Sequence, residues 1–429
     1  MTEDGTATRR GVLAAAGATL VAGCSEFGSL GDESSESVFG HELPEVTDDG
    51  DAEPVLAESI PVTIERSKLD DATRRVNELL ETLPMPFGPE SVPNGHVRGR
   101  LLDAASDATA RVEEARRAGT RFASLRSLRE ARASARYASA GWGFADRGVT
   151  RAELAAERER ALDEARTLRA NHEYRGTDPV RAALVHARVE RNLDGLLDAR
   201  TPSSRVEEGT LLGVAEWGEH AEEATALVAD TRYLYDRFTT SLPSDAGTVE
   251  KRLATAADRL ARDLRSRRAD LPPEPTENDR DIAWRLRYRL RDDAASSADR
   301  VADATGPASA VVTATDGLTD FLAYDRIRDR IDSDEEFGVG DAAEVRAVRS
   351  QAVEAIRTAL TESPRPELVR PVLADAASWV AFADEALARY RGEVRLARLD
   401  DPLRRYYTAT ARARSAPSAC RRVLDALER

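Results

Sequence analysis

The sequence predicts an all-α protein built from roughly a dozen antiparallel helices in one or two up-and-down bundles. Apolar residues recur at steps of three and four through most of the chain, which is the spacing of one helix face. Residues that start and stop helices divide this pattern into segments, many of about 20 residues. The connections are short and rich in Pro, Gly, Asp and Ser, and short connections favour antiparallel neighbours.

The helical pattern begins near Ser67. The first segment carries its apolar residues at Leu69, Ala72, Val76, Leu79 and Leu83. A second clear example has them at Val249, Leu253, Ala256, Leu260 and Leu264. Pro84 and Pro272 follow these two segments, and we expect both helices to end there because proline cannot donate the next helical hydrogen bond.

Helix starts are marked by polar residues at the expected positions. Thr150 and Asp341 are each followed three residues later by Glu, which is the spacing of a capping box. At Asp178 a capping residue stands directly before Pro179, and proline suits the first helical position because no amide is needed there. We therefore expect helices to begin just after Thr150, Asp178 and Asp341.

The body of the chain, residues 58–429, is longer than a single hydrophobic core usually serves. Turn-forming residues at 241–244 divide it into two parts of similar length. We expect one helical bundle half over residues 58–242 and a second over residues 243–429. Whether the halves arose by duplication stays open.

Residues 1–23 have the pattern of an export signal. Arg9 and Arg10 precede an apolar run over residues 11–22, which is too short to span a bilayer, since a spanning helix needs about 20 apolar residues. The paired arginines resemble the twin-arginine signal, which exports folded proteins, and Val-Ala-Gly before Cys24 resembles a lipobox. The resemblance to twin-arginine-exported lipoproteins implies that residues 1–23 are removed and that Cys24 carries a lipid.

Lipidation of Cys24 places the mature protein on the extracytoplasmic face of the cell membrane. A single acyl chain binds a membrane only marginally, so the diacyl or diether lipid typical of such lipoproteins is needed for stable attachment. Residues 24–57 carry ten Asp and Glu and no Lys or Arg. Because like charges extend a linker, we expect a disordered acidic tether here, with a reach on the order of 30 Å.

The composition is strongly acidic and nearly free of lysine. The net charge is −15, and the only lysines are Lys68 and Lys251. An acidic, Ala- and Arg-rich chain of this kind resembles the proteins of extremely halophilic archaea, in which excess surface charge keeps the protein hydrated. Nucleic-acid binding requires a concentrated basic surface, so this composition argues against a nucleic-acid partner.

A candidate metal site lies at Gly218-Glu219-His220-Ala221-Glu222-Glu223, which fits G-x-H-x-x-E. His220 and Glu223 are three residues apart and share one helix face, and a neutral imidazole with a carboxylate can begin a metal site. The spacing resembles the motif of the imelysin and periplasmic iron-uptake lipoproteins over six residues. The alternative is a surface histidine beside helix-stabilising acids.

The segment Trp284-Arg285-Leu286-Arg287-Tyr288-Arg289-Leu290-Arg291 is unusual in an acidic protein. Strict alternation is typical of a strand, but Ile282, Leu286 and Leu290 also form a helical stripe, and we favour a helix. As a partner contact, the arginines would meet anionic headgroups or an acidic partner, and the aromatic rings would supply flat surfaces. The contact residues would be Trp284, Arg285, Arg287, Tyr288 and Arg289. The alternative is that the arginines pair with acids of neighbouring helices.

We expect structural roles for the tryptophans and for Cys420, and no site made of histidines. The four tryptophans lie in Ala-rich helical segments, where helical spacing makes them core anchors. They are Trp142, Trp217, Trp284 and Trp379. Cys420 is the only cysteine besides Cys24, and we expect a small packed residue there. The five histidines are scattered, so we expect no histidine cluster.

The sequence favours an interaction protein over an enzyme. It contains no glycine-rich phosphate loop, no nucleophile elbow and no H-E-x-x-H. We expect a membrane-anchored extracytoplasmic lipoprotein that acts as an interaction or scaffold module of the cell envelope, with a protein partner there. The alternative is a solute- or metal-binding lipoprotein that works with a transporter through His220 and Glu223.

Overall fold

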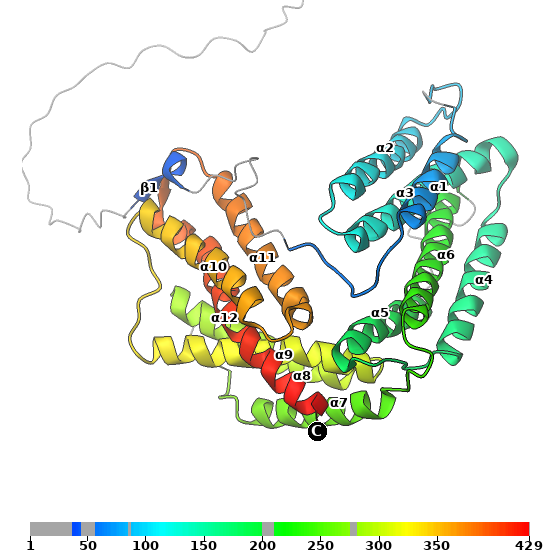
Figure 1. Ribbon diagram of the computed structural model, residues 1–429. Coiled ribbons are helices and arrows are strands. Elements are labelled where there is room, and N and C mark those ends of the chain that lie inside the picture. The colour runs from blue at the N-terminus through cyan, green and yellow to red at the C-terminus, as the bar shows by residue number, and fades with distance from the viewer. Residues whose placement is uncertain (1–36, 44–55, 85–86, 200–209, 275–280, 429) are drawn as a thin grey trace, which may run out of the picture. The chain divides into compact units, whose positions relative to one another are not determined.

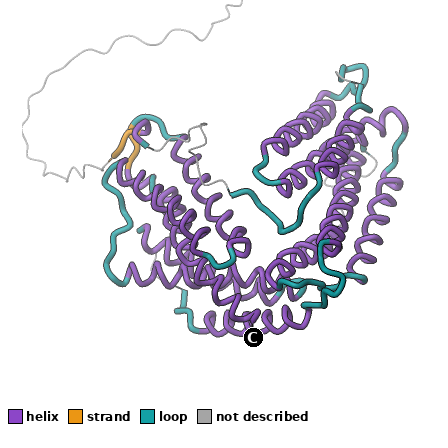
Figure 2. Tube along the Cα trace, viewed as in Figure 1, coloured by secondary structure: helices purple, strands orange, loops and turns teal. Residues whose placement is uncertain are grey.

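The computed structural model describes residues 37–43, 56–84, 87–199, 210–274 and 281–428, and within them the protein is all-α, as predicted. Figure 2 shows helices over nearly all of this chain, joined by loops. Twelve α-helices lie in the described residues (Figure 1). They are α1 (Arg66–Leu80), α2 (Gly95–Arg117), α3 (Arg121–Arg147), α4 (Arg151–Ala170), α5 (Pro179–Leu197), α6 (Leu211–Thr240), α7 (Glu250–Ala269), α8 (Ile282–Ala302), α9 (Pro307–Ile331), α10 (Ala342–Glu362), α11 (Pro366–Ala388) and α12 (Asp400–Glu428).

Two three-residue strands, β1 (Ser37–Phe39) and β2 (Glu393–Arg395), pair antiparallel with Val38 opposite Val394. Val38 is buried, and so is Leu43, which follows the turn of 3₁₀-helix at Gly40–Glu42. The prediction of a disordered tether over residues 24–57 is therefore wrong for residues 37–43, because two apolar side chains of that stretch are buried in the core. Cys24 and most of the remaining tether lie outside the described residues.

The capping residues act largely as predicted. Thr150 forms a full capping box at the start of α4, and Asp178 accepts hydrogen bonds from two backbone amides of α5. Asp341 caps α10. The Glu344 side chain, however, accepts from the backbone amide of Gly340 at 2.6 Å instead of from that of the capping residue. The helix starts are thus set by local hydrogen bonds that satisfy otherwise unpaired amides.

Helices α1 to α6 pack mainly on α3 and α6. Helix α3 contacts α1, α2 and α6, and α6 also contacts α4 and α5. Two buried carboxylates of α6 form ion pairs with basic residues of neighbouring helices. Glu222 pairs with Arg75 at 2.9 Å and with Arg132 at 2.7 Å. Asp230 pairs with Lys68 at 2.9 Å. These ion pairs tie α1 and α3 to α6.

Helices α7 to α12 pack mainly on α9 and α12. Helix α9 contacts α7, α8 and α12, and α12 in turn contacts α10 and α11 (Figure 1). Cys420 of α12 is fully buried as a free thiol, in line with the predicted packing role. Among the described residues, every helix is too short or too polar to span a bilayer.

Helix α5 connects the two sets of helices by packing on α9. Its Glu190 accepts hydrogen bonds from the backbone amides of Ala308 at 3.2 Å and Ser309 at 2.6 Å, which lie in the first turn of α9. A carboxylate at a helix N-terminus is stabilised by these unpaired amides. Residues 37–429 form one compact unit, and the division into halves at 242/243 stays a prediction.

Candidate functional site

The segment predicted as a partner contact forms the first turns of α8, so the helical interpretation is right and the strand alternative is wrong. Ile282, Leu286 and Leu290 are buried and belong to the main core of the molecule. With one stripe of α8 fixed in the core, the side chains at 284, 285, 288 and 289 lie on other faces of the helix.

These side chains line a cleft of about 420 Å³. We call it the aromatic–arginine cleft, and it is lined by Trp284, Arg285, Tyr288, Arg289, Trp379, Arg404 and Arg405. Three helices contribute: α8, α11 and α12. None of the described residues that line the cleft is acidic, although the chain as a whole carries a net charge of −15. The cleft is therefore an aromatic and cationic recess in an anionic protein.

The aromatic rings of the cleft are held in defined positions. Trp284 and Tyr288 are one turn apart on α8 and stack with 5.2 Å between ring centroids and 9° between ring planes. The guanidinium of Arg289 lies 5.9 Å from the centroid of the Trp379 ring, which joins α8 to α11 by a cation–π contact. Both contacts restrict the side chains before any ligand arrives.

The cleft arginines are also held by carboxylates that lie outside the cleft lining. Arg285 pairs with Asp400 at 3.6 Å and Arg289 with Asp293 at 3.2 Å. Arg404 and Arg405 both pair with Asp401, at 2.5 and 2.9 Å. Although burial acts in the opposite direction, the hydrogen bonds from these two arginines lower the pKa of Asp401. The arginines therefore pair with acids of the protein, as the alternative interpretation predicted. Each guanidinium group has five N–H donors, so these ion pairs orient the group and leave donors for a ligand.

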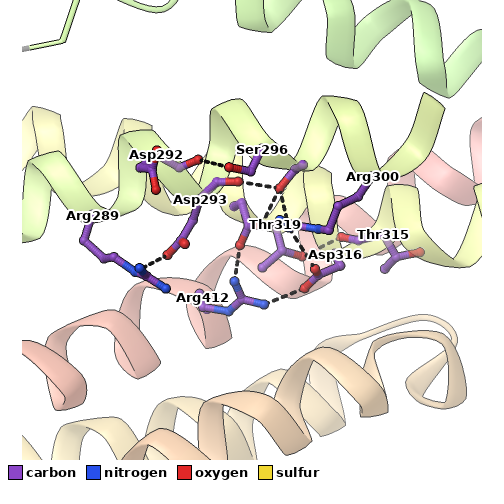
Figure 3. Close-up of polar contacts among 11 residues, drawn as sticks. Arg289, Asp292, Asp293, Ser296, Arg300, Thr315, Asp316, Thr319 and Arg412 are labelled. Atoms are coloured by element: carbon purple, nitrogen blue, oxygen red, sulfur yellow. Dashed lines mark hydrogen bonds and ion pairs between the residues drawn. The ribbon is translucent and has the colours of Figure 1, made fainter. Parts of the chain in front are cut away.

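A buried polar network joins α8 to α9 and α12 further along α8 from the cleft (Figure 3). Arg412 of α12 donates to Asp320 and, at 2.5 Å, to Asp316, both on α9. Asp320 also accepts from Ser297 of α8 at 2.6 Å and from Arg300 of α8 at 3.0 Å. Helices α8 and α12, which both contribute residues to the cleft, are therefore joined to α9 by hydrogen bonds to one buried carboxylate.

Charges in this network interact strongly because little water reaches them. Burial raises the pKa of Asp320 to about 7, and Arg412 is the largest opposing influence. Burial also raises the pKa of Asp293, the residue that pairs with Arg289 of the cleft, despite the attraction of that arginine. The network thus extends from the fully buried Asp320 to the edge of the cleft.

The predicted metal pair lies elsewhere, on an exposed part of α6. His220 Nδ1 and Glu223 Oε2 are 3.9 Å apart, and the two side chains are 41% and 55% exposed. The described residues contain no group of three or more His, Cys, Asp or Glu arranged to hold a metal ion. The structure therefore adds no further ligand to this pair among those residues.

Two histidines meet in the fold, which corrects the expectation of scattered histidines. His172 Nε2 and His186 Nδ1 are 2.9 Å apart, and His186 Nε2 lies 2.8 Å from the backbone oxygen of Arg175. Because a carbonyl oxygen only accepts, His186 Nε2 donates to it and His186 Nδ1 accepts the proton of His172. Tyr174 lies beside the pair and donates to Glu190 at 2.7 Å. We call these four residues, His172, Tyr174, His186 and Glu190, the histidine cluster.

The histidine cluster keeps its imidazoles neutral. Burial, together with the neighbouring His186, lowers the pKa of His172 to about 4. Burial also lowers the pKa of His186, in spite of its hydrogen bond to the backbone. Since Glu190 of the same cluster caps α9, these neutral rings lie where α5 meets α9.

Several site residues escaped the sequence analysis. The cleft also includes Trp379, Arg404 and Arg405, which lie far along the chain from α8. In the sequence, only the adjacent arginines at 404 and 405 indicate a basic surface there. Arg287, predicted as a contact, does not line the cleft. Trp217 is buried, whereas Trp142, Trp284 and Trp379 are partly exposed. The prediction of four core anchors therefore holds fully for Trp217 alone.

Comparison with known proteins divides the chain into two regions. Residues 67–245 are similar to the family described as Domain of unknown function (DUF8262), and residues 250–425 to the family described as Domain of unknown function (DUF8264). No curated protein and no solved structure matches the chain. The aromatic–arginine cleft lies wholly within the second region.

Proposed function

We propose that the protein is an exported, lipid-anchored interaction module of the cell envelope, and that its aromatic–arginine cleft binds an anionic partner there. The observation that carries the proposal is the composition of the cleft. Four arginines and three aromatic rings converge from three helices, with no acidic side chain among the described lining residues, in a chain of net charge −15. Trp, Tyr and Arg are the residues that dominate binding energy at protein interfaces.

The chemistry of the cleft suits binding at high salt, which the halophile-like composition leads us to propose. At about 1 M salt the Debye length is about 3 Å, so long-range attraction of a charged partner is screened. Direct guanidinium–anion contacts and stacking on aromatic rings act at shorter range. A partner is therefore held by contacts within the cleft and not by the overall field.

The proposed export and membrane anchoring depend on Arg9, Arg10 and Cys24, which lie outside the described residues. The order of these features is that of an export signal followed by a lipidated cysteine. A lipid on Cys24 would connect the helical body to the membrane through a mostly acidic linker. The cleft would then face partners in the envelope or on the cell surface.

Replacing Cys24 with serine is expected to move the protein from the membrane fraction into the medium, because the serine hydroxyl cannot form the lipid thioether. Immunoblots of membrane and medium fractions measure the change. Cys420→Ala is the matched control, since it removes the other thiol of the chain from a buried position, and it is expected to leave the protein membrane-bound. Full membrane retention of the Cys24→Ser protein would contradict the proposed anchor.

Binding through the cleft is tested with the released Cys24→Ser protein, added back to envelopes from cells that lack the gene. Adding Trp284→Ala, or Arg285→Ala together with Arg404→Ala, is expected to raise the Kd about 30-fold, since a central interface residue contributes about 2 kcal/mol or more. Co-sedimentation at fixed salt measures the Kd.

Arg287→Ala is the control for these variants because it changes a charge on the same helix outside the cleft. We expect envelope binding by this variant to match that of the parent. Circular dichroism shows whether each variant is folded. If both sets of cleft variants bind as tightly as Arg287→Ala, the cleft is not the contact and the proposed function is wrong.

A further inference from the structure

We propose that the ligand of the aromatic–arginine cleft is an acidic polysaccharide, that is, a polymer of sugar units bearing carboxylate or sulfate groups. This inference rests on the proposed function and specifies the chemistry of the partner. Three features carry it: the flat rings of the cleft, its guanidinium groups and the small apolar area exposed beside it.

The flat rings suit the faces of sugar rings. Trp284 and Tyr288 are stacked almost parallel, at 9°, and both line the cleft together with Trp379. Phe382 follows Trp379 by three residues on α11 and is 56% exposed, so it extends the aromatic surface by one turn. The C–H groups on a sugar face are weakly positive and pack favourably on the negative face of an aromatic ring.

The guanidinium groups suit the acidic substituents of such a polymer. Arg285 and Arg289 come from α8, whereas Arg404 and Arg405 come from α12, so the donors reach the cleft from two helices. Planar guanidinium groups bind carboxylate and sulfate through two parallel hydrogen bonds. Each arginine is already oriented by a carboxylate outside the lining, which lowers the entropy lost on binding.

The small exposed apolar area argues against a lipid surface as the ligand. The cleft, of about 420 Å³, is wide and shallow, so an elongated polymer can lie along it. Among the described residues, the only exposed large hydrophobics are Phe39 and Phe382. One exposed ring beside the cleft is a small apolar area for membrane insertion, since such binding scales with the apolar area buried.

An acidic peptide is the other anionic alternative, but its carboxylate side chains offer no sugar face to stack on the three rings. Binding by charge alone requires the four arginines but none of the rings. Because rings make up three of the seven lining residues, we infer that stacking accounts for much of the affinity. Stacking on rings also tolerates salt that weakens charge-only binding.

The experiment uses the full chain with Cys24→Ser, at about 2 M KCl, and follows tryptophan fluorescence and co-sedimentation. The probes are polygalacturonate for sugar carboxylates, dextran sulfate for sugar sulfates, unmodified dextran, polyglutamate, and vesicles of phosphatidylglycerol. We expect binding to at least one acidic polysaccharide, and binding at least about ten-fold weaker to dextran, polyglutamate and vesicles. We also expect Trp284→Ala to weaken polysaccharide binding about ten-fold with every arginine intact, and Arg287→Ala to leave it unchanged.

Three results would overturn the inference: no binding to either acidic polysaccharide, equal binding to polyglutamate, or preferred binding to vesicles. Competition separates this inference from the proposed function. If envelope binding requires the cleft but neither polysaccharide competes for it, the polysaccharide assignment fails and the interaction function stands. If envelope binding does not require the cleft at all, the proposed function itself fails.

Discussion

Replacing Arg412 with methionine is expected to lower the free energy of unfolding by about 3–5 kcal/mol, which is typical when one partner of a buried ion pair is removed. Arg412 is 7% exposed, and its partner Asp320 is fully buried. Without the guanidinium, the carboxylate would keep hydrogen bonds from Ser297 and Arg300 only. Urea unfolding at fixed KCl concentration, followed by circular dichroism, measures the change.

The size of this effect depends on the charge of Asp320. Burial already raises its pKa to about 7, and Arg412 acts against that shift, so the variant is expected to raise the pKa further. Asp320→Asn in the Arg412→Met background removes a buried carboxyl that must otherwise bind a proton or stay charged without Arg412, and we expect it to recover part of the lost stability.

The matched control for Arg412→Met is Arg421→Met on the same helix. Arg421 is exposed and, within the described part of the chain, hydrogen-bonds only its neighbour Ser418, so the control is expected to change stability by no more than about 0.5 kcal/mol. An Arg412→Met protein as stable as this control would show that the network does not hold α8, α9 and α12 together.

Acidification from pH 6.5 to pH 4 is expected to destabilise the fold through the histidine cluster. The unfolded His172 takes up a proton near pH 6.5, whereas the folded residue does so only near pH 4. Between these values the unfolded state binds more protons than the folded state. The free energy that the neutral His172 contributes to folding is therefore fully present above pH 6.5 and is lost as the pH falls to 4. The shift corresponds to at most about 3 kcal/mol, and partial exposure reduces this to on the order of 2 kcal/mol.

The measurement is a comparison of urea unfolding for the parent protein and His172→Gln across this pH range. Asp320, with its raised pKa, titrates in part of the same window with the opposite sign, and the difference between the two proteins removes its effect. We expect the stability of the variant to fall less steeply than that of the parent. Identical pH profiles would mean that His172 is not kept neutral in the folded protein.

Much of the fold follows from patterns that are local in the sequence. The cap at Asp178 and the stripe of Ile282, Leu286 and Leu290 each require only a few neighbouring residues, and the structure confirms both. Alternation over residues 284–291 pointed to a strand, but the longer helical context decided the outcome. A helix satisfies all of its interior backbone hydrogen bonds without a partner, which a single strand cannot do.

Only part of the cleft could be predicted from the sequence. Its α8 side could be predicted because aromatic and arginine residues alternate within eight positions. Trp379, Arg404 and Arg405 join it only through the packing of α11 and α12, and no local pattern states which helices become neighbours. Arg287 is adjacent in sequence to the cleft residue Tyr288 but does not line the cleft, because successive positions of a helix lie on different faces.

The remaining errors have the same physical origin. His172 and His186 belong to different segments, and the chain between them must turn before the rings meet at 2.9 Å. Residues 37–43 read as part of an acidic linker because their strand partner, β2, lies more than 350 residues away. Long-range pairings of this kind depend on the finished fold and not on the composition of the segment.

Photo-crosslinking in living cells shows whether a partner occupies the aromatic–arginine cleft at the cell surface. A benzophenone amino acid is placed at Phe382, beside the cleft, or at His220, which is exposed on α6. We predict a high-mass adduct that contains carbohydrate from position 382 and none from position 220. Adducts of equal yield from both positions, or from position 220 alone, would contradict the claim.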